Sequence, residues 1–258
     1  MALGFIGTGE ITKAVVIGLS TVAGDKPDII LSPRNGQIAG ELAARFANVT
    51  VAASNQAVID AADMLFLALR PLGAGEILKT LTFRAGQHVV SFMATYDVAA
   101  IRALVAPADT VTLVTPLPAV AFHGGPTPIY PPDDEIVAMF SPLGTAVAVE
   151  TPEEYQALCV ATSTLAGAFA YYETIADWLE AKNVPADKAR AFSGAVFYAL
   201  AATAKNAPHL NFSELTLESA TKGGTNEQVV KLLKERGVYN ALNDGMDAIW
   251  ERFENAKK

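Results

Sequence analysis

The chain has 258 residues, of which 51% are hydrophobic and 18% are charged, and its formal net charge is −8. This length suits two modest domains or one large one, and the composition excludes a disordered chain. The acidic balance argues against a general nucleic-acid surface and against binding to an anionic membrane. A single cysteine, Cys159, excludes an intrachain disulfide and a cysteine-based metal cluster, and the three histidines lack metal-ligand spacing, so no metal is expected.

Two features of the sequence bear on location. No uninterrupted apolar stretch reaches about 18 residues, so no segment is expected to span a membrane. The first apolar strand follows Met1 almost at once, which leaves no room for a signal peptide. We therefore expect a cytoplasmic protein.

The chain begins with a short apolar run at 2–6, the turn Gly7-Thr8-Gly9 and a helical pattern from residue 10. A strand, a glycine turn and a helix in this order bind the pyrophosphate of a dinucleotide, because a helix N-terminus offers N–H groups and partial positive charge. Gly7 permits the tight turn, and Gly9 lets the backbone approach the phosphates without a Cβ. An ordinary strand-turn-helix is the alternative interpretation of this pattern.

The first 150 residues alternate short apolar segments with helical patterns. Runs rich in Val, Ile, Leu and Phe predict strands buried on both faces of a parallel sheet. Strands are expected at 2–6, 28–32, 49–53, 63–69, 88–93, 110–114, 126–130 and 145–150, and helices at 10–22, 36–47, 55–61, 73–80, 97–104 and 132–142. This alternation predicts an α/β fold, with residues 1–150 forming a Rossmann-type, doubly wound dinucleotide-binding domain.

After about residue 152 the strand signals stop. Thr151-Pro152 resembles an N-cap followed by a proline at the first helical position, and a long helical pattern continues to about residue 183. Further helices are expected at 186–205, 212–219, 225–236 and 238–256. Residues 151–258 therefore form an expected all-α domain. Two of its helices are apolar on more than one face and must be covered, so we predict a homodimer through these helices; a self-sufficient bundle is the alternative.

The end of the second expected strand bears on the choice of coenzyme. Folds that prefer NAD place an acid there for the ribose 2′-hydroxyl, and this chain has none. It offers Ser32, Arg34 and Asn35, which would accommodate the 2′-phosphate of NADP. The sequence therefore predicts NADP, with NADPH preferred over NADH, and an ordinary polar turn is the alternative.

Other strand ends face the same crevice, because the carboxyl ends of parallel strands meet at one edge of a sheet. The segment 68–71 follows the fourth strand, and Ala94 follows the fifth. The expected cofactor-binding residues are Gly7, Thr8, Gly9, Glu10, Ile11, Ser32, Arg34, Asn35, Ala68, Leu69, Arg70, Pro71 and Ala94.

A double glycine, Gly223-Gly224, separates two of the late helices. The N–H groups from Gly224 onward predict a second anion site at a helix N-terminus, where a small carboxylate would fit. Thr221, Thr225 and Asn226 would add side-chain donors, and Lys222 a positive charge. A glycine-terminated helix followed by a threonine cap is the alternative.

In these segments the chain resembles the pyrroline-5-carboxylate reductase family over nearly its whole length. Segment 4–9 resembles the family's opening, and 68–71 resembles its Ala-Val-Lys-Pro. Segment 118–120 resembles the end of Met-Pro-Asn-Thr-Pro-Ala. Segment 173–177 resembles the family's first long dimer helix. Segment 220–226 resembles its substrate loop Thr-Ser-Pro-Gly-Gly-Thr-Thr, and segment 239–252 resembles its last helix.

The resemblance implies a reductase that delivers hydride from NAD(P)H to the C=N carbon of a cyclic imino acid, giving proline. It also implies a dimer of interlocked C-terminal helices, sometimes within a larger ring, and a substrate carboxylate held by the double-glycine loop. Carried over to this chain, the substrate-binding residues are Thr221, Lys222, Gly223 and Gly224, and the catalytic residues are Thr225 and Asn226.

The chain departs from the family's pattern at several positions. Thr12 stands where the family usually has alanine, and Pro116 replaces an asparagine near the nicotinamide. Lys222 replaces proline and Asn226 replaces the second threonine of the substrate loop. These departures leave open a reductase of a related cyclic imine or a keto acid, and a catalytically idle NADP-binding dimer.

Overall fold

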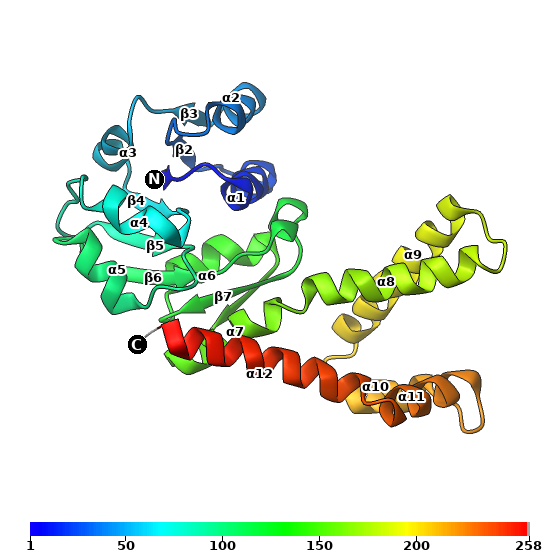
Figure 1. The fold of residues 1–258 in the computed structure, drawn as a ribbon. Helices are drawn as coiled ribbons and strands as arrows, with labels where there is room; N and C mark the ends of the chain where they lie inside the picture. Colours follow the sequence, from blue (N-terminus) through cyan, green and yellow to red (C-terminus); the bar gives the residue numbers. More distant parts are fainter. Residues whose placement is uncertain (257–258) are drawn as a thin grey trace. The chain divides into compact units, whose positions relative to one another are not determined.

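The computed structural model describes residues 1–256, which divide into two compact units, Met1–Cys159 and the described residues from Val160 onward (Figure 1). The division falls inside helix α7 (Pro152–Thr162), because Tyr155 and Cys159 are buried in the core of the first unit. The predicted domain limit at residue 150 precedes this helix and stays a prediction. The last two residues of the predicted second domain lie outside the described residues.

The first unit contains one eight-stranded sheet in the order β3-β2-β1-β4-β5-β6-β7-β8. Strands β1 to β6 are parallel, β7 is antiparallel to β6, and β8 is parallel to β7. The strands are β1 (Ala2–Ile6), β2 (Asp28–Leu31), β3 (Val49–Val51), β4 (Met64–Leu67), β5 (His88–Ser91), β6 (Thr110–Val114), β7 (Pro126–Tyr130) and β8 (Thr145–Ala148).

The reversed direction of β7 and β8 differs from the parallel sheet that the apolar runs predict. Only a short connection containing the 3₁₀ helix η1 (Pro118–Phe122) joins β6 to β7. A parallel connection needs a crossover of a dozen or more residues, usually an α-helix. Helix α6 (Asp134–Phe140) provides such a crossover between β7 and β8, and these two strands are parallel.

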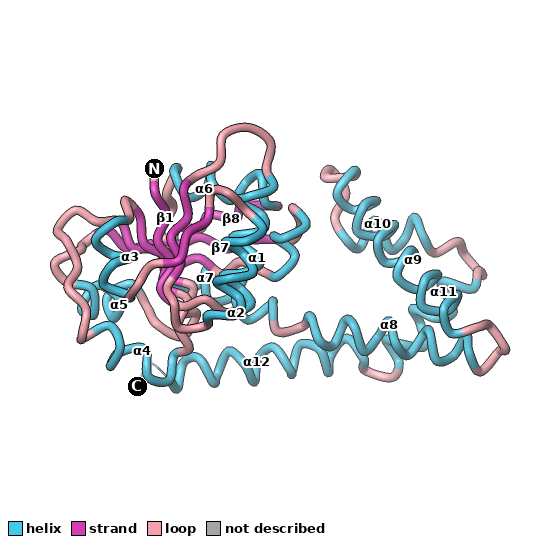
Figure 2. Tube along the Cα trace, turned by 90° about the horizontal axis from the view of Figure 1, so that it is seen from above, coloured by secondary structure: helices cyan, strands magenta, loops and turns pink. Residues whose placement is uncertain are grey.

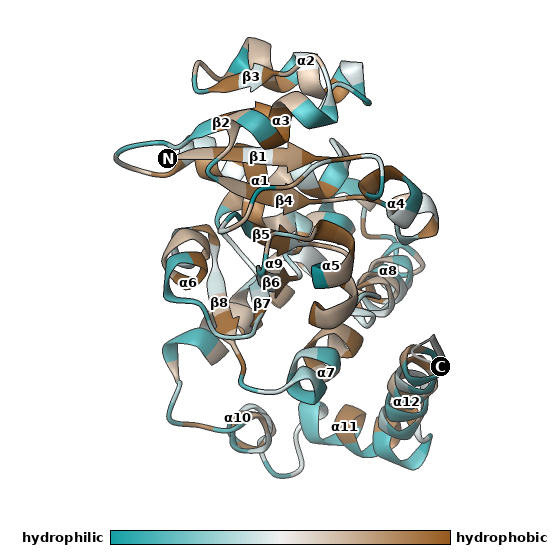
Figure 3. Cartoon of the chain, turned by 90° about the vertical axis from the view of Figure 1, so that its left-hand side faces the viewer, coloured by the Kyte–Doolittle hydropathy of each residue, from teal (hydrophilic) through white to brown (hydrophobic). Residues whose placement is uncertain are grey.

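Helices cover both faces of the sheet (Figure 2), so the doubly wound prediction is confirmed. One core cluster joins the sheet to α1, α2, α6 and η1; the other joins it to α3, α4, α5 and the first turns of α7. Strands β1 and β4 are among the most hydrophobic segments (Figure 3), and the rings of Phe5 and Phe66 stack between them, 4.6 Å apart. The helices are α1 (Glu10–Thr21), α2 (Gly36–Arg45), α3 (Asn55–Ala61), α4 (Pro71–Leu78), α5 (Val98–Val105) and α6 (Asp134–Phe140), with a second 3₁₀ turn η2 (Ser141–Leu143).

The second unit is helical, as predicted. It contains the end of α7, then α8 (Leu165–Glu180), α9 (Ala186–Asn206), α10 (Phe212–Ser219), α11 (Thr225–Glu235) and α12 (Val238–Ala256). The prediction of one continuous helix from 152 to 183 is wrong. The hydroxyls of Ser163 and Thr164 donate to the carbonyls of Val160 and Ala161, at 2.6 and 2.8 Å. Such side-chain bonds compete with the helical ladder, and the helix is interrupted there.

Helices α8 and α9 pack as a pair, with the rings of Tyr172 and Phe197 stacked at 3.6 Å between centroids. Several large apolar side chains of the second unit are nevertheless exposed, among them Phe169 at 69%, Phe192 at 60% and Tyr198 at 78%. None of the described helices is long and apolar enough to cross a membrane.

Candidate active site

The glycine turn between β1 and α1 needs glycine at two positions for different reasons. Gly7 has φ +100°, and a Cβ on it would lie 2.4 Å from the carbonyl oxygen of Ala68. Gly9 is the N-cap of α1, and a Cβ built there would meet no protein atom within 4 Å. The space beside Gly9 is therefore open to a ligand, in front of the first amides of α1.

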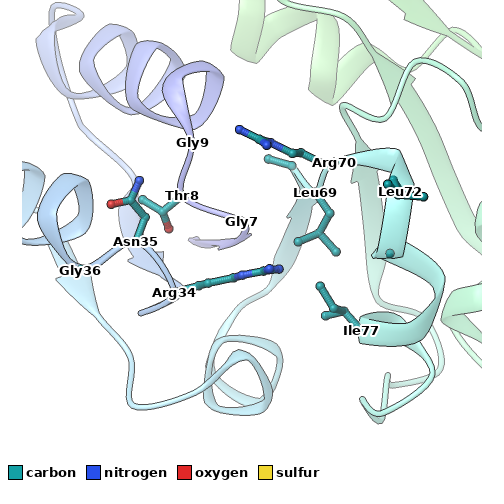
Figure 4. Close-up of a pocket in the computed structure, with 12 residues that line it drawn as sticks. Gly7, Thr8, Gly9, Arg34, Asn35, Gly36, Leu69, Arg70, Leu72 and Ile77 are labelled. Atoms are coloured by element: carbon teal, nitrogen blue, oxygen red, sulfur yellow. The ribbon is translucent and has the colours of Figure 1, made fainter.

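A pocket of about 650 Å³ lies over this turn, at the carboxyl ends of β1, β2 and β4. Figure 4 shows the Arg34 side chain extending toward Leu69 and the Arg70 side chain pointing toward Gly9. The pocket is lined by Gly7, Thr8, Gly9, Arg34, Asn35, Gly36, Ala68, Leu69, Arg70, Leu72, Gly73 and Ile77.

The charge of this pocket is opposite to that of the whole chain. Its lining contains Arg34 and Arg70 and no Asp or Glu, whereas the chain has a net charge of −8. Within residues 1–256 neither guanidinium forms an ion pair. Two arginines that lack acidic partners, beside a helix N-terminus, fit a ligand with several phosphates, so these residues fit a dinucleotide.

Most of the residues expected to bind a cofactor meet in this pocket, although that role stays a prediction for each of them. Glu10, Ile11, Pro71 and Ala94 are not among its lining residues. Sequence reasoning missed Gly36, Leu72, Gly73 and Ile77. The sequence carried a signal for two of these residues, because the proline and glycine of Pro71-Leu72-Gly73 are both typical of turns. In the structure Leu72 and Gly73 leave helical geometry at the start of α4, and Leu72 is 98% exposed.

Ser32 lies in a different environment from the expected residues that line the pocket. Its contact with a 2′-phosphate stays a prediction, and in the structure the residue is fully buried. Its Oγ accepts the N–H of Gly7 at 2.9 Å, and its carbonyl oxygen accepts the hydroxyl of Thr8 at 2.9 Å. Ser32 therefore holds the glycine turn from within the protein. Asn35 has a structural role as well, because its side chain accepts the N–H of Ile38 at the start of α2.

A buried polar cluster lies at the end of β6. The Thr115 and Tyr155 hydroxyls are 2.7 Å apart, and the Cys159 thiol donates to Thr115 Oγ1 at 3.4 Å. Burial raises the pKa of Tyr155 well above its usual value and also raises the pKa of the Cys159 thiol. Both groups therefore stay protonated near neutral pH, and Cys159 is the buried core residue that the sequence predicts.

In the second unit, the double-glycine loop is closed by its own hydrogen bonds. The N–H of Gly223 donates to Glu227 Oε2 at 2.6 Å, and the N–H of Gly224 donates to the Thr221 carbonyl at 2.8 Å. Asn226 Nδ2 donates to the Ser219 carbonyl at 2.9 Å. The Gly224 N–H, which we expected to bind a carboxylate, therefore already has the Thr221 carbonyl as its acceptor. The amides that α11 presents begin at Thr225, because the first N–H groups of a helix have no partner within it.

Two family models match the chain. Residues 2–95 match the family described as NADP oxidoreductase coenzyme F420-dependent. Residues 154–256 match the family described as pyrroline-5-carboxylate reductase dimerisation. The two matches cover the glycine turn and the helical unit, in the chain order that the sequence predicts.

Known proteins resemble the chain over its whole length. The pyrroline-5-carboxylate reductase of Escherichia coli (strain K12) is 27% identical over 270 residues, which cover 99% of this chain and 98% of that protein. A solved pyrroline-5-carboxylate reductase from Coxiella burnetii has a TM-score of 0.85 at 18% identity. A Plasmodium falciparum pyrroline carboxylate reductase, solved with NADP bound, has a TM-score of 0.84 at 12% identity. Each solved comparison covers 100% of this chain and 98% of the other.

Proposed function

The chain belongs to the pyrroline-5-carboxylate reductase family, whose members are NAD(P)H-dependent oxidoreductases acting on CH–NH bonds, and from this premise we propose its reaction. We propose that it reduces the C=N bond of a cyclic imino acid with NADPH, converting 1-pyrroline-5-carboxylate to L-proline in proline biosynthesis. The single observation that carries the coenzyme choice is the pocket of Arg34 and Arg70 without an acidic residue.

The proposed coenzyme contacts follow from the lining of that pocket. The amides at the start of α1, beside Gly9, receive the pyrophosphate together with Arg70. Arg34, which follows β2 at the position where an NAD-preferring fold has its acid, receives the 2′-phosphate. The arrangement supports NADPH because both phosphate groups would meet a positive partner.

The proposed mechanism needs little acid–base machinery. Bound NADPH supplies the hydride, and an imine whose nitrogen is already protonated needs no strong general acid. The protein's contribution is then orientation and exclusion of water. We assign the substrate carboxylate to the amides of Thr225 and Asn226 at the start of α11, with Thr221 as a further donor. The Asn226 side chain donates to Ser219, which leaves its carbonyl oxygen to accept the imine N–H.

Lys222 belongs to the proposed substrate site. It is exposed in the double-glycine loop and would add positive charge beside the substrate carboxylate.

We further propose a homodimer through the helices of the second unit. It is supported by the dimerisation family match and by exposed Phe169, Phe192 and Tyr198. A cytoplasmic location, expected from the sequence, belongs to the same proposal.

Substrate identity is tested by NADPH oxidation with a panel of cyclic imines. We expect the highest kcat/KM with pyrroline-5-carboxylate, lower values with pyrroline-2-carboxylate and piperideine carboxylates, and none with a keto acid. A preference for another imine would redirect the proposal to a related substrate, which the departures at Lys222 and Asn226 make the second candidate. NADPH binding without turnover of any imine would refute a reductase.

A further inference from the structure

Two fully buried hydroxyls hold the peptide units on either side of Gly7. The Ser32 Oγ, just after β2, accepts the Gly7 N–H at 2.9 Å. The Thr12 Oγ1, on α1, donates to the Gly7 carbonyl oxygen at 2.7 Å. Neither side chain lines the pocket. The two hydroxyls come from different elements and meet at the one residue where the chain turns from β1 into α1.

The turn needs such restraint because of its geometry. Gly7 has φ +100°, a conformation reached without penalty only because glycine has no Cβ, and the same freedom lets the turn reorient. The Thr8 hydroxyl adds a third bond by donating to the Ser32 carbonyl at 2.9 Å. A buried N–H or C=O that loses its partner is destabilised, so these bonds favour one orientation of the turn.

We propose that Ser32 and Thr12 are positioning residues that lock the Gly7 turn and so aim the first amides of α1 at the coenzyme pyrophosphate. The inference rests on the proposed function for the identity of the coenzyme. Because NADPH and NADH share the pyrophosphate, the lock contributes equally to the binding of both. It gives a role to the departure at Thr12, where an alanine would leave the Gly7 carbonyl without this partner.

The test compares Ser32→Ala and Thr12→Val with Thr12→Ser, which keeps the hydroxyl. Fluorescence titration measures the Kd of NADPH and of NADH, and NMR measures the exchange rate of the Gly7 amide without coenzyme. We expect Ser32→Ala and Thr12→Val to raise both Kd values about tenfold, with their ratio unchanged. Gly7 exchange should become faster in both variants. Thr12→Ser should restore parental binding and exchange.

Several results would overturn the proposal that Ser32 and Thr12 position the Gly7 turn. One is a Ser32→Ala loss confined to NADPH, which would indicate direct contact with the 2′-phosphate. A second is an unchanged Kd for both coenzymes although the Gly7 amide exchanges faster. A third is that Thr12→Val and Thr12→Ser change the Kd values and the Gly7 exchange rate equally. Failure of the proposed function would give other results. Arg34→Ala would weaken the binding of NADPH and NADH equally, or the parent protein would bind neither coenzyme. The Gly7 exchange rates still confirm or refute the lock in that case, because they need no coenzyme.

Discussion

Arg34 and Arg70 lie in one pocket but come from different strand ends, and we expect them to have separate tasks. Arg34 follows β2, and dinucleotide-binding folds read the ribose 2′-substituent at the end of this strand. Arg70 follows β4 and points toward Gly9 (Figure 4). The positive charge of both is always present, since an arginine side chain does not deprotonate in proteins. Selectivity between the coenzymes should therefore depend on one of these residues and not on the other.

Replacing Arg34 with alanine should weaken NADPH binding selectively. Loss of a charge-assisted contact to the 2′-phosphate should raise the Kd for NADPH about 10- to 100-fold, while the Kd for NADH changes less than about twofold. Titration with both coenzymes measures this. Arg45→Ala is the matched control, because Arg45 lies over the Phe46 ring, 4.8 Å from its centroid, and does not line the pocket. Equal losses for NADPH and NADH would remove Arg34 from the phosphate site.

At the scale of single elements, packing distinguishes helices that look alike in sequence. Helices α1 and α2 each contain an internal glycine, Gly18 and Gly40. A Cβ on Gly18 would lie 2.6 Å from the Val120 carbonyl of η1, whereas one on Gly40 would meet nothing within 4 Å. Gly18 is therefore required by the close approach of η1 to α1, and Gly40 is not.

Alanine at these two positions should change stability in opposite directions. Gly18→Ala should lower the free energy of unfolding by about 1–3 kcal/mol, because the methyl group has no room against a backbone oxygen. Gly40→Ala should raise it by about 0.5–1 kcal/mol, since alanine is the better helix former at an open position. Urea denaturation of both variants measures the difference. Similar changes in both would contradict the packing of α1 on η1.

The first turn of α11 contains Glu227, whose negative charge would repel the substrate carboxylate that we assign to this helix N-terminus. The Glu227 carboxylate accepts the Gly223 N–H and stands at the same helix N-terminus as the assigned substrate carboxylate. Glu227→Gln keeps an acceptor for Gly223 and removes the charge, so KM for the imino acid should fall about two- to fivefold at constant kcat. Steady-state kinetics measure this. Glu235→Gln, in the last turn of the same helix, should leave KM unchanged; an unchanged KM in Glu227→Gln would argue against a carboxylate there.

At the scale of the whole molecule, the two units differ in how they bury apolar surface. The first unit has two continuous core clusters, one on each face of its sheet. In the second, α8, α10 and α11 contain no buried residue, and large apolar side chains are exposed on them. Exposed apolar surface of this extent marks an interaction site, which agrees with the dimerisation family match.

A charge on the exposed face of α9 should disrupt the dimer. Phe192→Glu places a carboxylate at an apolar side chain that is 60% exposed in the single chain, and it should raise the dimer dissociation constant at least about thirtyfold. Sedimentation analysis over a range of concentrations measures this. Phe122→Glu is the matched control in the first unit, where Phe122 is 87% exposed. A dimer that survives Phe192→Glu would refute an interface on α9.

The sequence by itself determined where all eight strands and most helices lie along the chain, because each element depends on a local apolar period and on local turn residues. It also indicated the glycine turn and an arginine in place of an acid, since these are properties of short segments. Only the tertiary structure decided the reversed direction of β7 and the meeting of Arg70 with Arg34 in one pocket. It also showed that the Ser32 hydroxyl faces the Gly7 N–H. These depend on which distant segments pack together, and a hydroxyl at a strand end has the same sequence signature whether it faces a ligand or a neighbouring backbone.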